Sequence, residues 1–205
     1  MNMNRNYLYH RATFAVVVLL LLGSIQVRGS SLPDFRIINA GLGQQFAVSV
    51  AGLEPGEAEF QVKNQRGRVL LSQSIKGAEY QGIYSLEGMG EGAYTFVLRT
   101  SGTEISQPIQ LTRRAVLYNL EARTVVYFPE VILKGRQLDV NFLNPALADF
   151  TLVLRNEGGH VLYEQTFKGV PDIEKRINLL QVPAGDFYLE MKTPLYHWQQ
   201  AISLE

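Results

Sequence analysis

The most constraining feature of the chain is an internal repeat. Residues 64–77 recur as residues 156–169, and seven of the fourteen positions are identical. The similarity continues outward, from 43–46 and 135–138 on one side to 92–100 and 185–193 on the other. A repeat of this length predicts two similar modules in tandem rather than one domain of 205 residues.

Both copies carry apolar residues at every second position, which is the pattern of a half-buried β-strand. The matching rows are Ala58, Phe60, Val62 with Phe150, Leu152, Leu154; Tyr94, Phe96, Leu98 with Phe187, Leu189, Met191; and Ile105, Gln107, Ile109, Leu111 with Trp198, Gln200, Ile202, Leu204. Turn residues separate these rows. We expect Gly67, Gly159, Gly92 and Gly185 to be structural turn glycines, with a positive φ at Gly67 and Gly159.

Each module contains about six or seven short strands at intervals of roughly 8–12 residues, the spacing of an antiparallel sandwich. The predicted fold class is therefore all-β, with two tandem immunoglobulin-like antiparallel β-sandwiches after an N-terminal signal peptide. We expect the signal peptide at residues 1–29, the first module at 30–112 and the second at 113–205. Within the second, residues 116–128 suggest an extra hairpin around residues 121–123.

The N-terminal segment has the order of a secretory signal. A basic start with Arg5 and Arg11 precedes an apolar run at residues 14–22, and a polar Ser30-Ser31 follows Gly29. The alternative is a membrane anchor, but a spanning helix needs roughly 20 apolar residues and this run is about half as long. We therefore expect cleavage after Gly29, no stable membrane span afterwards, and a mature protein that is periplasmic, on the cell surface or secreted.

Composition excludes several kinds of chemistry. The chain has no cysteine, so disulfides, thiolate nucleophiles and cysteine metal sites are impossible. Lysine and arginine number 19, as do aspartate and glutamate, and no basic cluster would bind a phosphate backbone, so we expect no nucleic-acid partner. His160 and His197 match surface residues of the other copy. We expect no catalytic residues, no metal ligands and no cofactor.

The remaining candidates for contact with a partner are aromatic side chains, turn tips and strand edges. Tyr188 is expected on the outer face of its strand, and together with Tyr163 and Tyr196 it would form an exposed patch that contacts a sugar or a peptide; isolated surface tyrosines are the alternative. Trp198 is expected in the core. The turn tips at 64–67 and 156–159, or an open sheet edge, offer further contact surfaces.

The C-terminal part of the chain resembles a known family. The segments Asn156-Glu157-Gly158-Gly159-His160-Val161-Leu162-Tyr163 and Leu180-Gln181-Val182-Pro183-Ala184-Gly185-Asp186-Phe187-Tyr188-Leu189 resemble the C-terminal sorting domain of proteins exported by the Bacteroidetes type IX secretion system. The chain is also similar to small exported immunoglobulin-like proteins of that phylum that have no assigned activity. The resemblance implies an immunoglobulin-like fold without catalytic residues.

These observations lead to one main hypothesis and two alternatives. The main hypothesis is a non-enzymatic, exported binding or structural protein of the cell envelope, whose partner is a protein or a glycan. The first alternative is a type IX sorting domain carried by residues 115–205. The second is a carbohydrate-active or hydrolytic enzyme, which would need paired carboxylates about 5–10 Å apart, from Glu130, Asp139 or Glu190.

Overall fold

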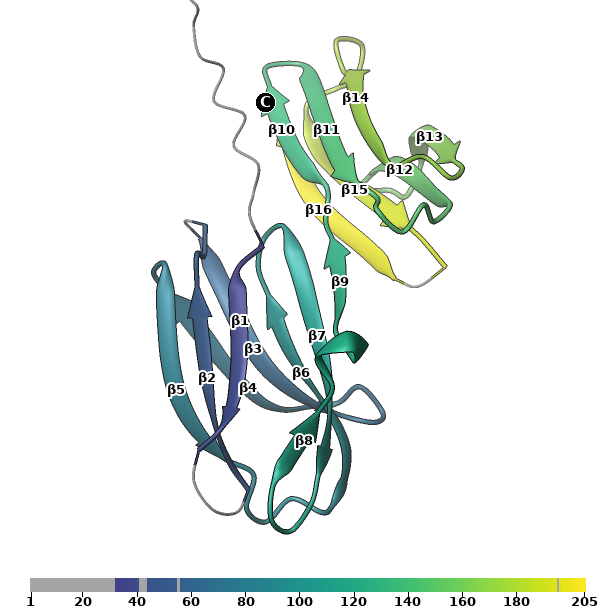
Figure 1. Ribbon diagram of the computed structural model, residues 1–205. Coiled ribbons are helices and arrows are strands. Elements are labelled where there is room, and N and C mark those ends of the chain that lie inside the picture. Colours follow the sequence, from purple (N-terminus) through teal and green to yellow (C-terminus); the bar gives the residue numbers. More distant parts are fainter. Residues whose placement is uncertain (1–31, 41–43, 55, 195) are drawn as a thin grey trace, which may run out of the picture. The chain divides into compact units, whose positions relative to one another are not determined.

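The computed structural model describes residues 32–205, apart from 41–43, 55 and 195. The predicted signal peptide lies outside the described residues. The strands of the first half are β1 (Asp34–Asn39), β2 (Gln45–Ala51), β3 (Glu57–Asn64), β4 (Val69–Lys76), β5 (Glu79–Ser85), β6 (Gly92–Arg99), β7 (Thr103–Leu111), β8 (Val116–Tyr118) and β9 (Thr124–Tyr127) (Figure 1). Those of the second half are β10 (Glu130–Lys134), β11 (Gln137–Leu143), β12 (Phe150–Asn156), β13 (Val161–Phe167), β14 (Asp172–Asn178), β15 (Gly185–Lys192) and β16 (His197–Leu204).

The strand order confirms the predicted all-β class and repeats from one half to the other. In the first half a three-stranded sheet, β1-β2-β5, accompanies a sheet that begins β4-β3-β6-β7. In the second half the sheets are β10-β11-β14 and β13-β12-β15-β16, which is the same order of corresponding strands. All pairings are antiparallel, and two facing sheets connected in this way form an immunoglobulin-like sandwich.

The inward-facing rows of each sandwich form its own hydrophobic cluster. In the first, Phe60 and Phe96 are fully buried and contact edge to face with ring centroids 5.6 Å apart. In the second, the corresponding positions are Leu152 and Leu189, which are also fully buried. Trp198 lies in this second cluster, as predicted, and is only 8% exposed. Burial of these rows supplies most of the driving force for folding, because the chain has no disulfide.

The duplication extends to hydrogen bonds in the turns between β3 and β4 and between β12 and β13. The Asn64 carboxamide oxygen accepts the backbone N–H of Arg68 at 3.0 Å, and that of Asn156 accepts the N–H of His160 at 2.8 Å. Each turn then needs a left-handed residue, and Gly67 and Gly159 have φ of +76° and +81°. This is the conformation that the turn prediction requires.

The other two turn glycines precede strands of the four-stranded arrays. Gly92 and Gly185 occupy corresponding positions at the starts of β6 and β15, with φ of +149° and +147°. These φ values lie in a region that glycine adopts readily and that residues with a Cβ rarely adopt.

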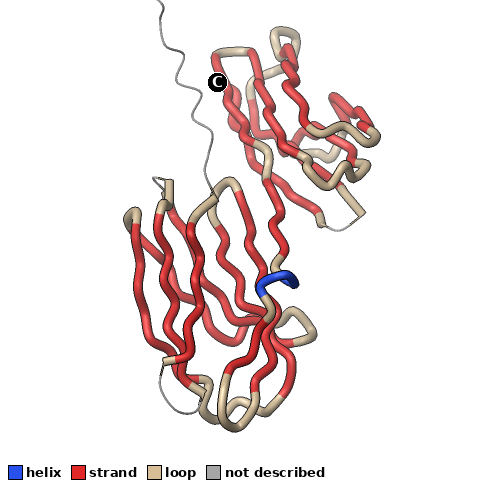
Figure 2. The backbone as a smooth tube through the Cα atoms, viewed as in Figure 1, coloured by secondary structure: helices blue, strands red, loops and turns tan. Residues whose placement is uncertain are grey.

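The segment after β7 differs from its prediction. Residues 119–123 do not turn the chain back as a hairpin; they form a single turn of 3₁₀-helix, Leu120–Ala122, shown as the blue element in Figure 2. The strands β8 and β9 on either side of it both pair antiparallel with β7, and they follow one another along its edge. Val116 is fully buried in the first cluster, and Tyr118 and Val125 pack against it, whereas Tyr127 and Phe128 at the end of the segment pack against the second cluster. The last strand that pairs with β7 ends at Tyr127, and the next sheet begins with β10 at Glu130.

The described residues contain no helix that is long and apolar enough to cross a membrane.

Candidate binding surfaces

The part of the chain that the structure describes offers no metal centre, because its His, Asp and Glu side chains nowhere gather in groups of three or more suited to hold an ion. His160 is exposed at the tip of the β12–β13 turn. His197 is also exposed, and its Nε2 lies 3.6 Å from a carboxylate oxygen of Glu190.

Of the three carboxylates that a hydrolase would need, Asp139 and Glu190 lie on different sheets of the second sandwich. Asp139 projects outward from the three-stranded sheet of the second sandwich, between the buried Leu138 and Val140, and accepts two hydrogen bonds from Arg176 at 2.6 and 3.0 Å. This pairing lowers the pKa of Asp139. Glu190 projects outward from the other sheet of that sandwich. The hydrophobic core separates these two carboxylates, so they cannot act on one substrate together.

Glu130 lies on the same sheet as Asp139, but its carboxylate has a different hydrogen-bond partner. One of its carboxylate oxygens accepts a hydrogen bond from the Asn141 side chain at 3.3 Å. Glu130 pairs with Asn141 and Asp139 pairs with Ile132 in the β10–β11 ladder, so the two acids are two pairs apart along that ladder. The two acids thus share a face of the sheet, and each carboxylate has its own partner, Arg176 for Asp139 and Asn141 for Glu130.

The three tyrosines of the expected patch do not lie together. Tyr163 faces the core side of β13, where the Lys175 ammonium lies 5.4 Å from the centre of its ring. Tyr196 is also packed against the core, and its hydroxyl donates to the Tyr127 carbonyl at 3.0 Å. Burial raises the pKa of Tyr196 to about 12. Tyr188 alone is on the outer face. The prediction that the three tyrosines form one exposed patch is therefore wrong. A role in binding for each tyrosine stays a prediction.

Around Tyr188 the outer face of the second four-stranded sheet carries a charge cluster that the sequence analysis missed. Glu190 is its centre: Lys192 Nζ lies 2.8 Å and Arg155 Nε 3.6 Å from its carboxylate oxygens. The hydrogen bond from Lys192 lowers the pKa of Glu190, and the charges of Lys192, Arg155 and His197 lower it further against the opposing effect of burial. In the first copy the corresponding residue is Val97. Comparing the outward rows of the copies would have revealed the substitution.

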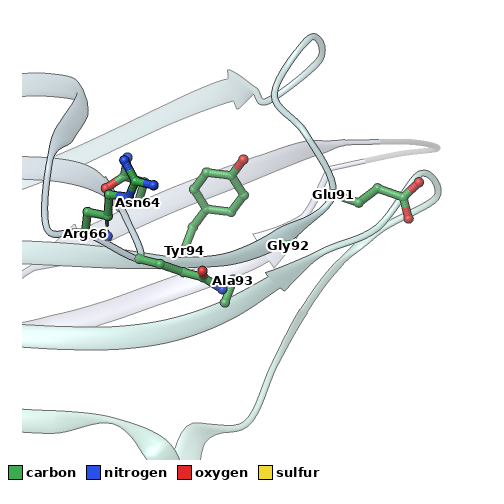
Figure 3. A pocket seen from close by; sticks show the side chains of 7 residues that line it. Asn64, Arg66, Glu91, Gly92, Ala93 and Tyr94 are labelled. Atoms are coloured by element: carbon green, nitrogen blue, oxygen red, sulfur yellow. Dashed lines mark hydrogen bonds between the residues drawn. The ribbon is translucent and has the colours of Figure 1, made fainter.

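At the tip of the first sandwich, the β3–β4 turn and the loop before β6 enclose a shallow depression of about 270 Å³. It is lined by Asn64, Gln65, Arg66, Glu91, Gly92, Ala93 and Tyr94 (Figure 3). The Tyr94 ring stands between Arg66 on one side and Glu91 on the other. Its hydroxyl donates to the Gly90 carbonyl at 2.7 Å, and Glu91 accepts from Arg113 at 2.6 Å. The depression lies at the tip of the turn formed by residues 64–67, which the sequence analysis named as a possible contact surface; that role stays a prediction.

The edges of the four-stranded arrays differ between the sandwiches. In the first, β8 and β9 cover the edge of β7 (Figure 1). In the second, β16 pairs with β15 on one side, and no described strand pairs with its other side. The sequence analysis named an open edge as a possible contact surface, and β16 is one of the edge strands among the described residues.

Comparison with known proteins adds little to this picture. No protein-family model matches the chain, and no curated protein matches it. Among solved structures, it is similar to the BSP domain of a biofilm-associated protein, with 14% identity and a TM-score of 0.29 over 82% of this chain and 29% of the other. It is also similar to the FN1–FN3 domains of chicken CNTN1, with 8% identity and a TM-score of 0.29 over 84% of this chain and 66% of the other.

A third similar structure is the human OSCAR ligand-binding domain, with 14% identity and a TM-score of 0.26 over 84% of this chain and 97% of the other. The chain thus spans less than a third of the biofilm-associated protein and about two thirds of the CNTN1 fragment. Likenesses this distant concern the fold alone. The immunoglobulin-like assignment depends on the strand order and register described above.

Proposed function

We propose that this protein is an exported, non-enzymatic binding or structural component of the cell envelope. The observation that carries the proposal is a duplicated sandwich that offers a turn-tip depression and an open strand edge, while Asp139 and Glu190 project from different sheets and Glu130 and Asp139 are each hydrogen-bonded to a neighbouring side chain. Such rigid scaffolds commonly present loops and edges to partners. Export is inferred from residues 1–29 of the sequence, and the partner is a protein or a glycan of the envelope.

The strand pairing also leads us to propose a boundary between the modules later than residue 112. Strands β8 and β9 hydrogen-bond to β7, and Val116 is buried in the first cluster. The second module therefore begins after Tyr127 rather than at residue 113, and a fragment expressed without the first module should start there.

Site-specific photo-crosslinking in cells tests the binding function. A benzophenone amino acid is placed at Arg66 on the turn tip, at Gln199 on the β16 edge, or at the control position Glu174, which is exposed on the other sheet. The expected result is a discrete adduct from Arg66 or Gln199 in the envelope fraction, and none from Glu174. Equal adducts from all three positions, or turnover of a glycan or peptide substrate by the purified chain, would count against the proposal.

Export is tested separately by fractionating cells that express the full chain or a chain lacking residues 1–29. The full chain should leave the cytoplasm and the shortened chain should stay. If both chains stayed in the cytoplasm, the proposed location in the cell envelope would be refuted.

The second candidate, a type IX sorting domain, draws on the sequence resemblance across residues 138–205. A reporter fused before residues 128–205 is a cleaner test than one fused before residue 115, because β8 and β9 would lose their partner strand β7 in the longer fusion. Arrival of the reporter at the cell surface would support this candidate, and its retention in the periplasm would reject it.

A further inference from the structure

The edge of β7 shows how this fold accepts an additional strand. Residues 109–111 of β7 pair with β8, and residues 103–106 pair with β9. The added segment turns Val116, Tyr118 and Val125 toward the core, where Val116 is fully buried and the other two are partly buried. It is thus an extended strand, antiparallel to β7, with apolar residues facing inward and one kink in the middle.

The kink lies where β7 contains a proline. Pro108 pairs with Thr95 in an unbroken ladder with β6, and because proline has no N–H its nitrogen must be turned away from β6, toward the added segment. Neither β8 nor β9 pairs with Pro108, and the 3₁₀ turn bridges this gap. The proline therefore explains the break in the strand that covers β7.

In β16 the corresponding residue is an alanine. Ala201 pairs with Tyr188 as Pro108 pairs with Thr95, so its N–H points to the open edge. Because backbone groups alternate along a strand, Gln199 and Ser203 also turn their N–H and C=O groups to that side. The edge of β16 thus offers continuous hydrogen bonding where the edge of β7 is interrupted.

A glutamine that both copies share gives a second, independent observation. Gln107 is fully buried in the inward row of β7; its amide donates to the Asn119 carbonyl at 2.8 Å, and its carbonyl oxygen accepts from Arg123 at 3.1 Å. Both partners belong to the added segment. Gln200 occupies the same place in β16, pairing with Leu189 as Gln107 pairs with Phe96. No hydrogen bond joins the Gln200 side chain to another described residue.

We propose that the open edge of β16 binds an extended segment of a different protein, which adds as an antiparallel strand with apolar residues at alternate positions and a backbone carbonyl opposite Gln200. The inference rests on the proposed binding function and names the site and the class of partner. The chain's own residues 116–127 show the chemistry that fits, since they satisfy the equivalent glutamine on the equivalent edge. Alanine in place of proline allows the foreign strand to run without a kink.

The test is a titration of the ¹⁵N-labelled chain 30–205, which contains every described strand, with a synthetic peptide of residues 114–128. Peptide is added up to about 1 mM, the effective concentration that a short tether supplies. The expected result is saturable shift changes at the outward amides Gln199, Ala201 and Ser203, with slower hydrogen exchange there. A control peptide in which the three inward apolar residues are serine should leave the spectrum unchanged.

Two variants examine the proposed contacts. Ala201→Pro removes one edge donor and should weaken binding roughly tenfold, the effect of about one hydrogen bond; Pro108 shows that this position accommodates proline. Gln200→Leu should weaken binding severalfold while leaving the spectrum of the free chain otherwise intact. Equal affinity of both variants and the original chain would refute the proposed contacts.

The other outcomes also decide the matter. Shift changes confined to β7 would mean that the peptide displaces the chain's own strand, and concentration-dependent shifts at β16 without peptide would assign the edge to a second copy of this chain. Either result, or no response at β16, overturns the inference. The proposed binding function would survive these outcomes if photo-crosslinking from Arg66 still captured a partner, so the two failures can be told apart.

Discussion

Substitution of Gly159 isolates the energetic contribution of the turn that the duplication preserves. Gly159 has φ of +81°, its N–H donates to the Asn156 carbonyl at 2.9 Å, and no heavy atom lies within 4 Å of the place where a Cβ would be added. Steric clash with neighbouring residues is therefore absent. Any loss of stability must come from the backbone conformation itself, which L-residues rarely adopt.

The expected magnitude follows from two opposing effects. An L-residue in the left-handed region costs about 1–2 kcal/mol. Replacing glycine also reduces the entropy of the unfolded chain, which favours folding by about 0.4–1 kcal/mol. With mid-range values of both effects, Gly159→Ala should therefore lower the free energy of unfolding by about 0.8 kcal/mol. Gly159→Asn should cost less, because asparagine tolerates this region, and Gly159→Val should cost more because of its branched Cβ.

The single tryptophan makes the assay specific. Trp198 is buried in the second core, so its fluorescence during urea unfolding reports the sandwich that contains Gly159. Glu157→Ala in the same turn serves as the control, since Glu157 is exposed and its φ is not positive; a change within about 0.5 kcal/mol is expected there. An alanine variant as stable as the original chain, or an asparagine variant no better than alanine, would refute the strain argument.

Three further predictions concern the cores and the charge cluster. Phe60→Ala should destabilise the first sandwich by about 3–5 kcal/mol, as circular dichroism would show, while the Trp198 fluorescence midpoint stays in place if the two cores unfold separately; a parallel shift of both signals would contradict separate modules. Gln107→Leu should cost about 1–3 kcal/mol, because it leaves buried polar partners unsatisfied, and no change in the urea midpoint would contradict that role. The folded-state pKa of Glu190 is lowered, so its ionised carboxylate stabilises the fold above the ordinary carboxyl pKa of 4.5, and this stabilisation is lost as pH falls through the folded-state pKa. Glu190→Gln should therefore reduce the loss of stability on acidification. An unchanged dependence of stability on acidic pH would contradict this prediction.

Most of the fold could be predicted because burial leaves a clear periodic record in the sequence. The inward rows with Phe60 and Leu152, or Leu98 and Met191, repeat so closely that each copy supports the strand assignment of the other. The segment after β7 could not be predicted in the same way. Its strands β8 and β9 are three and four residues long, too short for a period to show, and only pairing with β7 identifies them.

The candidate surfaces were harder to predict because they depend on which side of a strand a residue faces and on what lies beside it. Tyr163 follows the β-bulge in the pairing of β12 with β13, where the register shifts, and it faces the core. Tyr196 precedes β16 and contacts Tyr127, which is distant in sequence. The turn at 64–67 was predictable, because the asparagine and the glycine that determine an Asn-x-x-Gly turn lie within four residues of sequence.

Divergence between the copies is more informative about function than their similarity. A duplicated fold begins with two identical edges, and the first copy covers its β7 edge with residues 116–127 of the chain that continues from it. The second copy keeps the glutamine that anchors such a segment but has Ala201 in place of Pro108. It also has Glu190, which lies beside Lys192 and Arg155, in place of the apolar Val97. An unpaired edge normally carries a risk of aggregation, and charged side chains on and beside it are a common protection. The cluster formed by Glu190, Lys192 and His197 lies on the strand pair that ends in this edge, which fits an edge kept open for a specific strand and protected from unspecific ones.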